Sequence, residues 1–143
     1  MLRYLLDTNI VIYVIKRRPI EVLEIFNQHA GRMALSSITL AELLHGAEKS
    51  SKPPVNLAVV EDLCSRLEVL PYDAKAAQHY GSIRAALEVR GQTIGVNDLH
   101  IAAHARSAGL TLVTNNLREF ERVDALQLEN WIADSFTAAQ ASA

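Results

Sequence analysis

The sequence predicts a single α/β domain: a short central parallel β-sheet flanked by helices on both faces. The chain has 143 residues, which is the length of one domain. Half of these residues are hydrophobic and 21% are charged, so the chain can bury a core. Short apolar segments alternate with longer helical ones, a pattern typical of parallel sheets whose strands are joined by helices.

The expected strands are short apolar runs at 4–6, 33–35, 69–70, 110–113 and 126–128. Helical periodicity or capping residues predict helices at 10–16, 39–49, 97–107 and 117–123, and further helices opened by Pro19, by Pro53 and Pro54, and by Asp73. Three glycines are expected to end helices, namely Gly31, Gly91 and Gly109. No linker divides the chain, so we expect one domain over residues 1–132 and a small polar tail over 133–143.

Composition narrows the class of protein. The formal net charge is −2, which by itself does not indicate a nucleic-acid-binding surface. With one cysteine, Cys64, no disulfide can form within the chain, as suits a reducing compartment. Asp7 and Asn9 interrupt the apolar start before it resembles a secretion signal. No apolar run reaches the ~18 residues of a membrane span. These features predict a cytoplasmic protein without a membrane partner.

Polar side chains follow several of the predicted strands. Asp7, Thr8 and Asn9 follow the first strand, Ser36 and Ser37 the second, and residues 114–116 the fourth. Ligands of parallel α/β sheets bind beyond the carboxyl ends of the strands. The sequence therefore predicts a site at this edge, with Asp7 as a candidate cation ligand oriented by its neighbours. Taken alone, Asp7 is equally typical of a helix N-cap.

Two further acids are candidates by their place on a helix. Asp98 falls on the apolar face of its helix, with Ile101, Ala102 and Ala105, so its charge needs a partner such as a metal or an arginine. Glu42 points away from the apolar residues of its own helix, Leu40, Leu43, Leu44 and Ala47, which favours an ordinary solvated glutamate. Gly46, one turn later, would allow another group to approach Glu42 closely.

Other chemistry is less well supported. His100 and His104 have the i, i+4 spacing of zinc ligands, but Ile101 replaces the glutamate of the zinc-protease motif, and both lie opposite Asp98. We interpret them as surface or packing residues. Ser36 and Ser37 lie in no nucleophile motif, and Cys64 lies on an apolar stripe. Asn116 and Glu119 form either a capping box or a further metal-binding pair, direct or through water.

Four segments together resemble the PIN-domain ribonucleases, and among them the VapC toxins of bacterial toxin–antitoxin pairs: YLLDTN, SSITLAELLHGAEKS, GVNDLHIAAHARSAGL and LVTNNLREFERV. The similarity extends from about Met1 to Trp131. It implies that Asp7, Glu42 and Asp98 converge as catalytic metal ligands. The family often has a fourth acid after the "TN" of the later strand, where this chain has Asn116, so Glu119 is the nearby candidate.

The resemblance also implies the chemistry. Clustered carboxylates repel one another, and a divalent cation relieves that repulsion. Oxygen ligands suit Mg²⁺, with Mn²⁺ as a substitute, rather than zinc. The expected reaction is endonucleolytic hydrolysis of RNA, with initiator tRNA, cut in the anticodon stem-loop, as the implied target. Thr8, Asn9 and Thr114 would orient the ligands. Five basic residues could contact RNA phosphates: Arg17, Arg18, Lys49, Arg84 and Arg118.

Partners are implied in the same way. We expect a VapB-type antitoxin, contact with DNA only through that antitoxin, and a homodimer formed through the helical pair at 39–67. Two other functions remain open. One is a metal-dependent DNA nuclease or phosphatase on a similar fold. The other is a binding module without activity, which the intact acidic trio disfavours.

Overall fold

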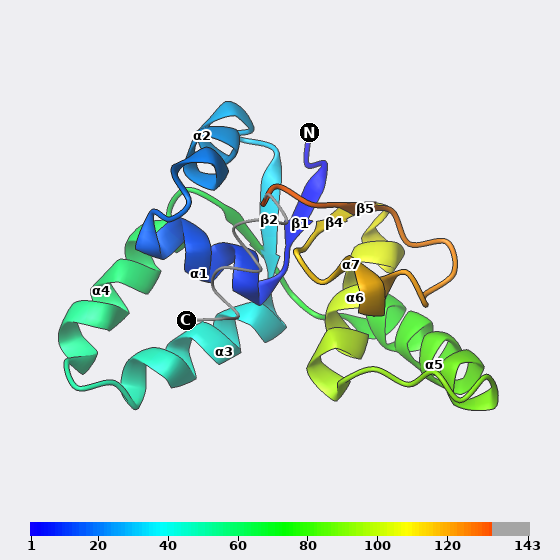
Figure 1. Ribbon diagram of the computed structural model, residues 1–143. Coiled ribbons are helices and arrows are strands. Elements are labelled where there is room, and N and C mark those ends of the chain that lie inside the picture. The colour runs from blue at the N-terminus through cyan, green and yellow to red at the C-terminus, as the bar shows by residue number, and fades with distance from the viewer. Residues whose placement is uncertain (133–143) are drawn as a thin grey trace.

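The computed structural model describes residues 1–132 and confirms the predicted fold class. A five-stranded sheet, parallel throughout, lies at the centre of the molecule (Figure 1). Its strand order is β3-β2-β1-β4-β5. The strands are β1 (Tyr4–Leu6), β2 (Met33–Ser36), β3 (Glu68–Leu70), β4 (Thr111–Val113) and β5 (Leu128–Glu129). The predicted tail at 133–143 lies outside the described residues.

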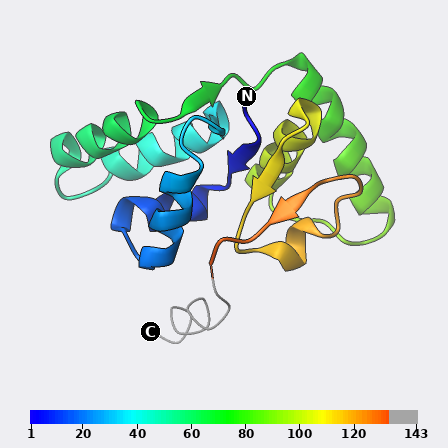
Figure 2. The same ribbon diagram turned by 90° about the horizontal axis from the view of Figure 1, so that it is seen from above.

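Helices cover both faces of the sheet, and the two views in Figures 1 and 2 agree on which helices lie on which side. One face carries α1 (Thr8–Lys16), α2 (Ile20–Gln28), α3 (Ser37–Glu48) and α4 (Pro53–Cys64). The other carries α5 (Ala74–Val89), α6 (Val96–Ala108) and α7 (Leu117–Phe120). No helix within residues 1–132 is both long enough and apolar enough to cross a membrane.

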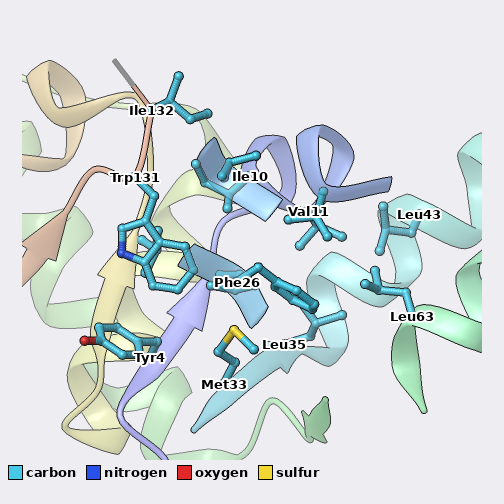
Figure 3. Close-up of a cluster of buried hydrophobic side chains, with 14 of the residues drawn as sticks. Tyr4, Ile10, Val11, Phe26, Met33, Leu35, Leu43, Leu63, Trp131 and Ile132 are labelled. Atoms are coloured by element: carbon cyan, nitrogen blue, oxygen red, sulfur yellow. The ribbon is translucent and has the colours of Figure 1, made fainter. Parts of the chain in front are cut away.

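Two hydrophobic cores follow from the alternation of side chains along each strand. Tyr4 and Leu6 of β1 face the α1–α4 side, whereas Leu5 faces α5 and α6. The first core also takes in Phe26, Met33 and Leu35, and Trp131 and Ile132 pack against it after β5 (Figure 3). Because the inner strands β1, β2 and β4 are largely buried on both faces, they read in the sequence as mostly apolar runs, whereas the edge strands β3 and β5 are less buried and each contains a glutamate.

Several details differ from the sequence prediction. Helix α2 ends at Gln28, so Gly31 (φ +83°) serves the turn after it rather than the helix end. Helix α7 ends at Phe120, three residues before its predicted end. The last strand is Leu128–Glu129 instead of 126–128. Leu44, placed on the apolar face of its helix by periodicity, is 39% exposed, because the buried face of α3 runs through Thr39, Leu43 and Ala47.

The strand order locates the edge at which a ligand binds. The chain passes from β1 outward through β2 to β3, and then returns to the other side of β1 to form β4. The order therefore reverses between β1 and β4, and the carboxyl ends of these two strands flank the crevice where parallel α/β proteins hold ligands. Asp7 immediately follows β1, and Thr114 immediately follows β4.

Candidate active site

Asp7 is fixed at this crevice by one hydrogen bond to each carboxylate oxygen. The backbone N–H of Thr8 donates to Oδ1 at 2.8 Å, and the Thr114 hydroxyl donates to Oδ2 at 2.9 Å. Asp7 thus caps α1 and also accepts a hydrogen bond from Thr114, which lies across the crevice at the end of β4. Its side chain is buried, and burial, followed by the negative charges of Glu42 and Glu119, raises its pKa. The cap and the site role are therefore compatible.

Glu42 reaches the same crevice from the second turn of α3. The Thr8 hydroxyl donates to Glu42 Oε1 at 2.9 Å and lies 3.2 Å from the hydroxyl of the fully buried Thr39. The interpretation of Glu42 as a solvated surface glutamate is therefore wrong. Gly46 has no part in this approach, because a Cβ there would meet nothing within 4 Å. Thr39 was not singled out in the sequence, although it lies one turn before Glu42.

Asp98 lies in the first turn of α6, on the opposite side of the sheet from α3. Because α6 leads into the amino end of β4, its own amino end lies at the carboxyl edge of the sheet, where Asp7 is. Burial and the charge of Asp7, followed by a hydrogen bond to Glu119 and the charges of Glu119 and Glu42, raise the pKa of Asp98 to about 7. The inward orientation predicted for Asp98 is thus correct.

Glu119 joins the cluster from α7. Its carboxylate accepts a hydrogen bond of 2.9 Å from the Asn116 side-chain amide, while the Asn116 backbone N–H donates to the Thr114 hydroxyl. The alternative of a capping box is therefore wrong, since that motif needs Glu119 to accept from the Asn116 backbone. The hydrogen bond with Asp98 requires a proton on one of the two carboxyl groups.

The four acids Asp7, Glu42, Asp98 and Glu119, here called the carboxylate cluster, influence one another through their charges. Within residues 1–132 none of them forms an ion pair with a lysine, arginine or histidine. Nor do three or more acids, histidines or cysteines of that range already close around one point as metal ligands. Like charges thus gather without a basic side chain paired to them in the described part of the chain. This donor set fits a hard divalent ion that would draw the carboxylates together.

His100 and His104 of α6 are packing residues, one of the two roles predicted for them in place of zinc binding. His100 stacks on Tyr80 with ring centroids 4.3 Å apart, and its Nδ1 lies 2.8 Å from the Tyr72 hydroxyl. His104 is buried, and its Nδ1 lies 2.8 Å from Ser36 Oγ. Both rings are thus held by packing contacts, and the side chains of the acids that gather at the crevice offer oxygen ligands.

Of the residues predicted to orient the metal ligands or to contact RNA, some lie at the carboxylate cluster and others lie away from it. Thr8 and Thr114 contact the carboxylate cluster directly, but Asn9 is exposed and its side chain makes no hydrogen bond within residues 1–132. Arg17 and Arg18 follow the far end of α1, roughly 12 Å from its start at 1.5 Å per residue. Lys49 lies at the end of α3, and Arg84 pairs with Glu88 and donates to the Tyr80 hydroxyl. Only Arg118 adjoins a cluster residue in sequence.

The raised pKa of Asp98 predicts how the stability of the metal-free protein depends on pH. A carboxyl group with a raised folded-state pKa contributes stability below its unfolded pKa of about 3.9, and that contribution is lost as pH rises through the folded value. Because that value is about 7, the melting temperature in EDTA should fall between pH 5 and pH 8. Differential scanning fluorimetry measures this fall. Asp98→Asn should flatten it, and an unchanged slope in that variant would contradict the assignment.

Comparison with known proteins agrees with this fold. The family profile of the PIN domain matches residues 4–126. Ribonuclease VapC2 of Haemophilus influenzae is 65% identical over 132 residues, covering 92% of this chain and 100% of that protein. The tRNA(fMet)-specific endonuclease VapC of Shigella flexneri is 56% identical over 131 residues, covering 92% and 99%. A chain in the crystal structure of DNA-bound VapBC from Salmonella typhimurium matches with a TM-score of 0.89 and 55% identity, covering 92% and 100%.

A parallel α/β sheet over nearly the whole chain, together with this profile match, places the chain in the PIN-domain family. Within that family it belongs to the VapC ribonucleases, which it matches at high identity over almost their full length. It is accordingly a nuclease, an enzyme that hydrolyses phosphodiester bonds. PIN-domain ribonucleases are generally metal-dependent.

Proposed function

We propose that this chain is the toxin of a toxin–antitoxin pair and acts as a Mg²⁺-dependent endoribonuclease in the cytoplasm. The observation that carries the proposal is the carboxylate cluster between the carboxyl ends of β1 and β4. Burial and the neighbouring carboxylates raise the pKa of Asp98 there to about 7, and no member has a cationic partner among the described side chains. The family relationship supplies the class of reaction.

In this proposal Asp7, Glu42 and Asp98 hold Mg²⁺, with Mn²⁺ as a substitute. When bound, such an ion supplies Lewis acidity toward a phosphate and lowers the pKa of a water molecule. The chain itself supplies orientation. Thr8 fixes Asp7 through its N–H and Glu42 through its hydroxyl, and Thr114 fixes the other oxygen of Asp7. Hydrolysis then leaves a 5′-phosphate and a 3′-hydroxyl.

The proposed substrate is initiator tRNA, cut in the anticodon stem-loop. Relatives from Shigella flexneri and Salmonella typhimurium, 56% and 55% identical, bear the name tRNA(fMet)-specific endonuclease. The test incubates the purified chain with initiator tRNA, an elongator tRNA, and single- and double-stranded DNA, and maps cleavage at nucleotide resolution. We expect cuts confined to the initiator anticodon stem-loop. Preferential cleavage of DNA would replace the proposal by a DNA nuclease.

Glu119 is proposed to compensate for the neutral Asn116 by strengthening the metal site through a bound water. Glu119→Gln removes a negative charge from the carboxylate cluster, so the Mg²⁺ concentration for half-maximal cleavage should rise. Asn116→Asp adds a charge beside Glu119 and should lower that concentration. Cleavage is measured against Mg²⁺ for the three proteins. An unshifted curve for Glu119→Gln would return Glu119 to a structural role, because Gln can still accept the Asn116 hydrogen bond.

An antitoxin of the VapB type is the proposed inhibitor, since the similar solved structures are VapBC complexes. An extended arm that places an arginine or lysine in the carboxylate cluster would neutralise it. We propose that an apolar segment of the same antitoxin lies in the groove of about 800 Å³ between α1, α2 and α4. Its lining includes Val14, Leu23, Val55, Val59 and Leu63. Val55 and Val59 are 57% and 38% exposed, so a partner would gain by covering them.

The groove predicts a variant that separates inhibition from catalysis. Val59→Glu places a charge in the apolar seat and should weaken antitoxin binding at least tenfold, while RNA cleavage stays unchanged. Val89→Glu is the matched control, because Val89 is 88% exposed on α5, away from the groove. Binding is measured by isothermal titration calorimetry with the antitoxin encoded beside this chain. If Val59→Glu binds the antitoxin with wild-type affinity, the groove is not the binding site of the antitoxin segment.

Assembly remains part of the proposal. A homodimer through the helical pair at 39–67 is expected, and light scattering checks its mass. Contact with DNA is expected only through the antitoxin. The VapBC structures from Salmonella typhimurium and Rickettsia felis, which this chain resembles, are bound to DNA. The chain without antitoxin should therefore give no shift with promoter DNA.

A further inference from the structure

Helix α6 is tied to the start of α3 by a group of polar and aromatic side chains, here called the brace: the buried Ser36 and His104 and the half-buried Ser37, Tyr72 and His100. His104 Nδ1 and Ser36 Oγ share a hydrogen bond of 2.8 Å, and the two residues are 3% and 0% exposed. Ser36 Oγ also accepts the backbone N–H of Ile38 at 3.1 Å and so caps α3. One hydroxyl therefore serves both helices.

Tyr72 adds a second link along the same line. Its backbone N–H donates to Ser37 Oγ at 3.0 Å, and its hydroxyl lies 2.8 Å from His100 Nδ1. Its ring stands edge-on to His104, with centroids 5.6 Å apart at 85°. Tyr72 follows β3, so the brace lies at the carboxyl edge of the sheet, like the carboxylate cluster. It joins the two helices on which Glu42 and Asp98 lie.

A buried polar pair of this kind is not needed for the fold itself. An apolar pair of the same shape would bury as well, whereas His104 and Ser36 must give up water for each other. Burial lowers the pKa of His104, which keeps the ring neutral at neutral pH. The hydrogen bond between His104 and Ser36 adds a defined geometry, because it fixes the position of one atom relative to another, which apolar packing does not.

The brace joins the two helices that carry Glu42 and Asp98, so it can fix the position of one helix against the other. Glu42 and Asp98 lie on opposite sides of the sheet, on α3 and α6, and their negative charges repel each other across the crevice. Within residues 1–132 the His104–Ser36 contact is the hydrogen bond that joins α6 to the beginning of α3. Repulsion between the carboxylates acts to separate the two helices, and the brace acts against that separation.

We propose that His104 is a positioning residue, which through Ser36 holds α3 against α6 and so sets the separation of Glu42 and Asp98. The inference rests on the proposed metal site. Its consequence is specific: loss of the His104 hydrogen bond should weaken divalent-ion binding about tenfold, as substitutions of groups that orient ligands do. Cleavage at saturating Mg²⁺ should change much less, because the ion then draws the carboxylates together.

The test compares two variants of His104 in the full chain. His104→Leu keeps the bulk and removes the hydrogen bond. His104→Asn keeps a polar atom at the position of Nδ1, and its amide can donate to or accept from Ser36 Oγ. We expect Mn²⁺ binding, measured by calorimetry without RNA, to weaken about tenfold in His104→Leu and to recover in His104→Asn. The Mg²⁺ concentration for half-maximal cleavage should follow the same order.

Ile101→Val is the matched control, because Ile101 is buried on the same helix and is not part of the brace. It should lower the melting temperature without changing Mn²⁺ affinity. If His104→Leu does not fold, Ser36→Ala removes the same bond together with the cap of α3 and should weaken Mn²⁺ binding at least tenfold. Wild-type Mn²⁺ affinity in the variant that folds would overturn the brace alone. Equal losses in His104→Leu, His104→Asn and Ile101→Val would also overturn it, as a merely structural effect. A wild-type chain that binds no Mn²⁺ would overturn the metal site and the brace together.

Discussion

Asp7→Asn and Asp98→Asn should each abolish RNA cleavage in a protein that remains folded. The amide is nearly isosteric with the carboxylate but lacks the charge that binds the cation. Loss of a metal's stabilisation of the transition state amounts to several kcal/mol, which corresponds to a decrease of at least about a thousandfold in rate. Single-turnover cleavage of initiator tRNA measures that decrease.

Stability separates this effect from unfolding. At pH 8 the Asp98 carboxyl group is ionised although its surroundings disfavour the charge. Asp98→Asn removes that charge and should raise the melting temperature of the metal-free protein. A gain of roughly 1 kcal/mol in the free energy of unfolding corresponds to about 2–5 °C in a domain of this size. Asp124→Asn is the control, since Asp124 is an exposed acid whose carboxylate pairs with Arg90 and which is not part of the carboxylate cluster. Wild-type cleavage by either site variant would remove that residue from the ligand set.

Removal of the metal should have the second large effect. Within residues 1–132 the carboxylate cluster has no lysine, arginine or histidine ion-paired to it that could stabilise charge on a phosphate. Cleavage should therefore fall to background in EDTA and return on addition of Mg²⁺ or Mn²⁺. The Asp7→Asn variant, treated in the same way, should stay inactive throughout. Full activity of the wild-type chain in EDTA would contradict the proposed mechanism.

The fold was largely predictable because burial on both faces of a parallel sheet leaves a simple record in the sequence. The inner strands read as apolar runs, and caps such as Asp73, which accepts from the Ala76 N–H, mark the helices. The exact ends were less predictable. Helix α7 and β5 are short and lie where turn geometry, rather than periodicity, decides the boundary.

The candidate site was predictable only in part, because helical periodicity reports burial and not what a half-buried polar side chain faces. Asp98 stood out since it replaces an apolar residue on an apolar face. Glu42 did not stand out, because it lies beside the buried face of its helix and its partner, Thr8, is 34 residues away in the sequence. Only the resemblance to the PIN-domain family predicted that Glu42 belongs to the site.

Side chains with partners distant in sequence could not be found from local pattern at all. His104 and Ser36 are 68 residues apart, and only the folded chain shows that they meet. Thr39 reads as one more helical threonine until Thr8 is placed beside it. Glu119 was identified by its spacing from Asn116, but its contact with Asp98 depends on how α7 and α6 meet at the crevice.

The central claim is that Asp7, Glu42 and Asp98 hold the divalent ion that the nuclease uses. Anomalous diffraction from crystals grown with Mn²⁺ tests it most directly. We predict a peak at the carboxyl edge of the sheet, between the ends of β1 and β4, within ligand distance of Asp7 and Asp98 and with Glu42 bound directly or through water. The peak should be absent in crystals of Asp98→Asn. A Mn²⁺ ion bound elsewhere, with the carboxylate cluster empty in a protein that still cleaves RNA, would contradict the claim.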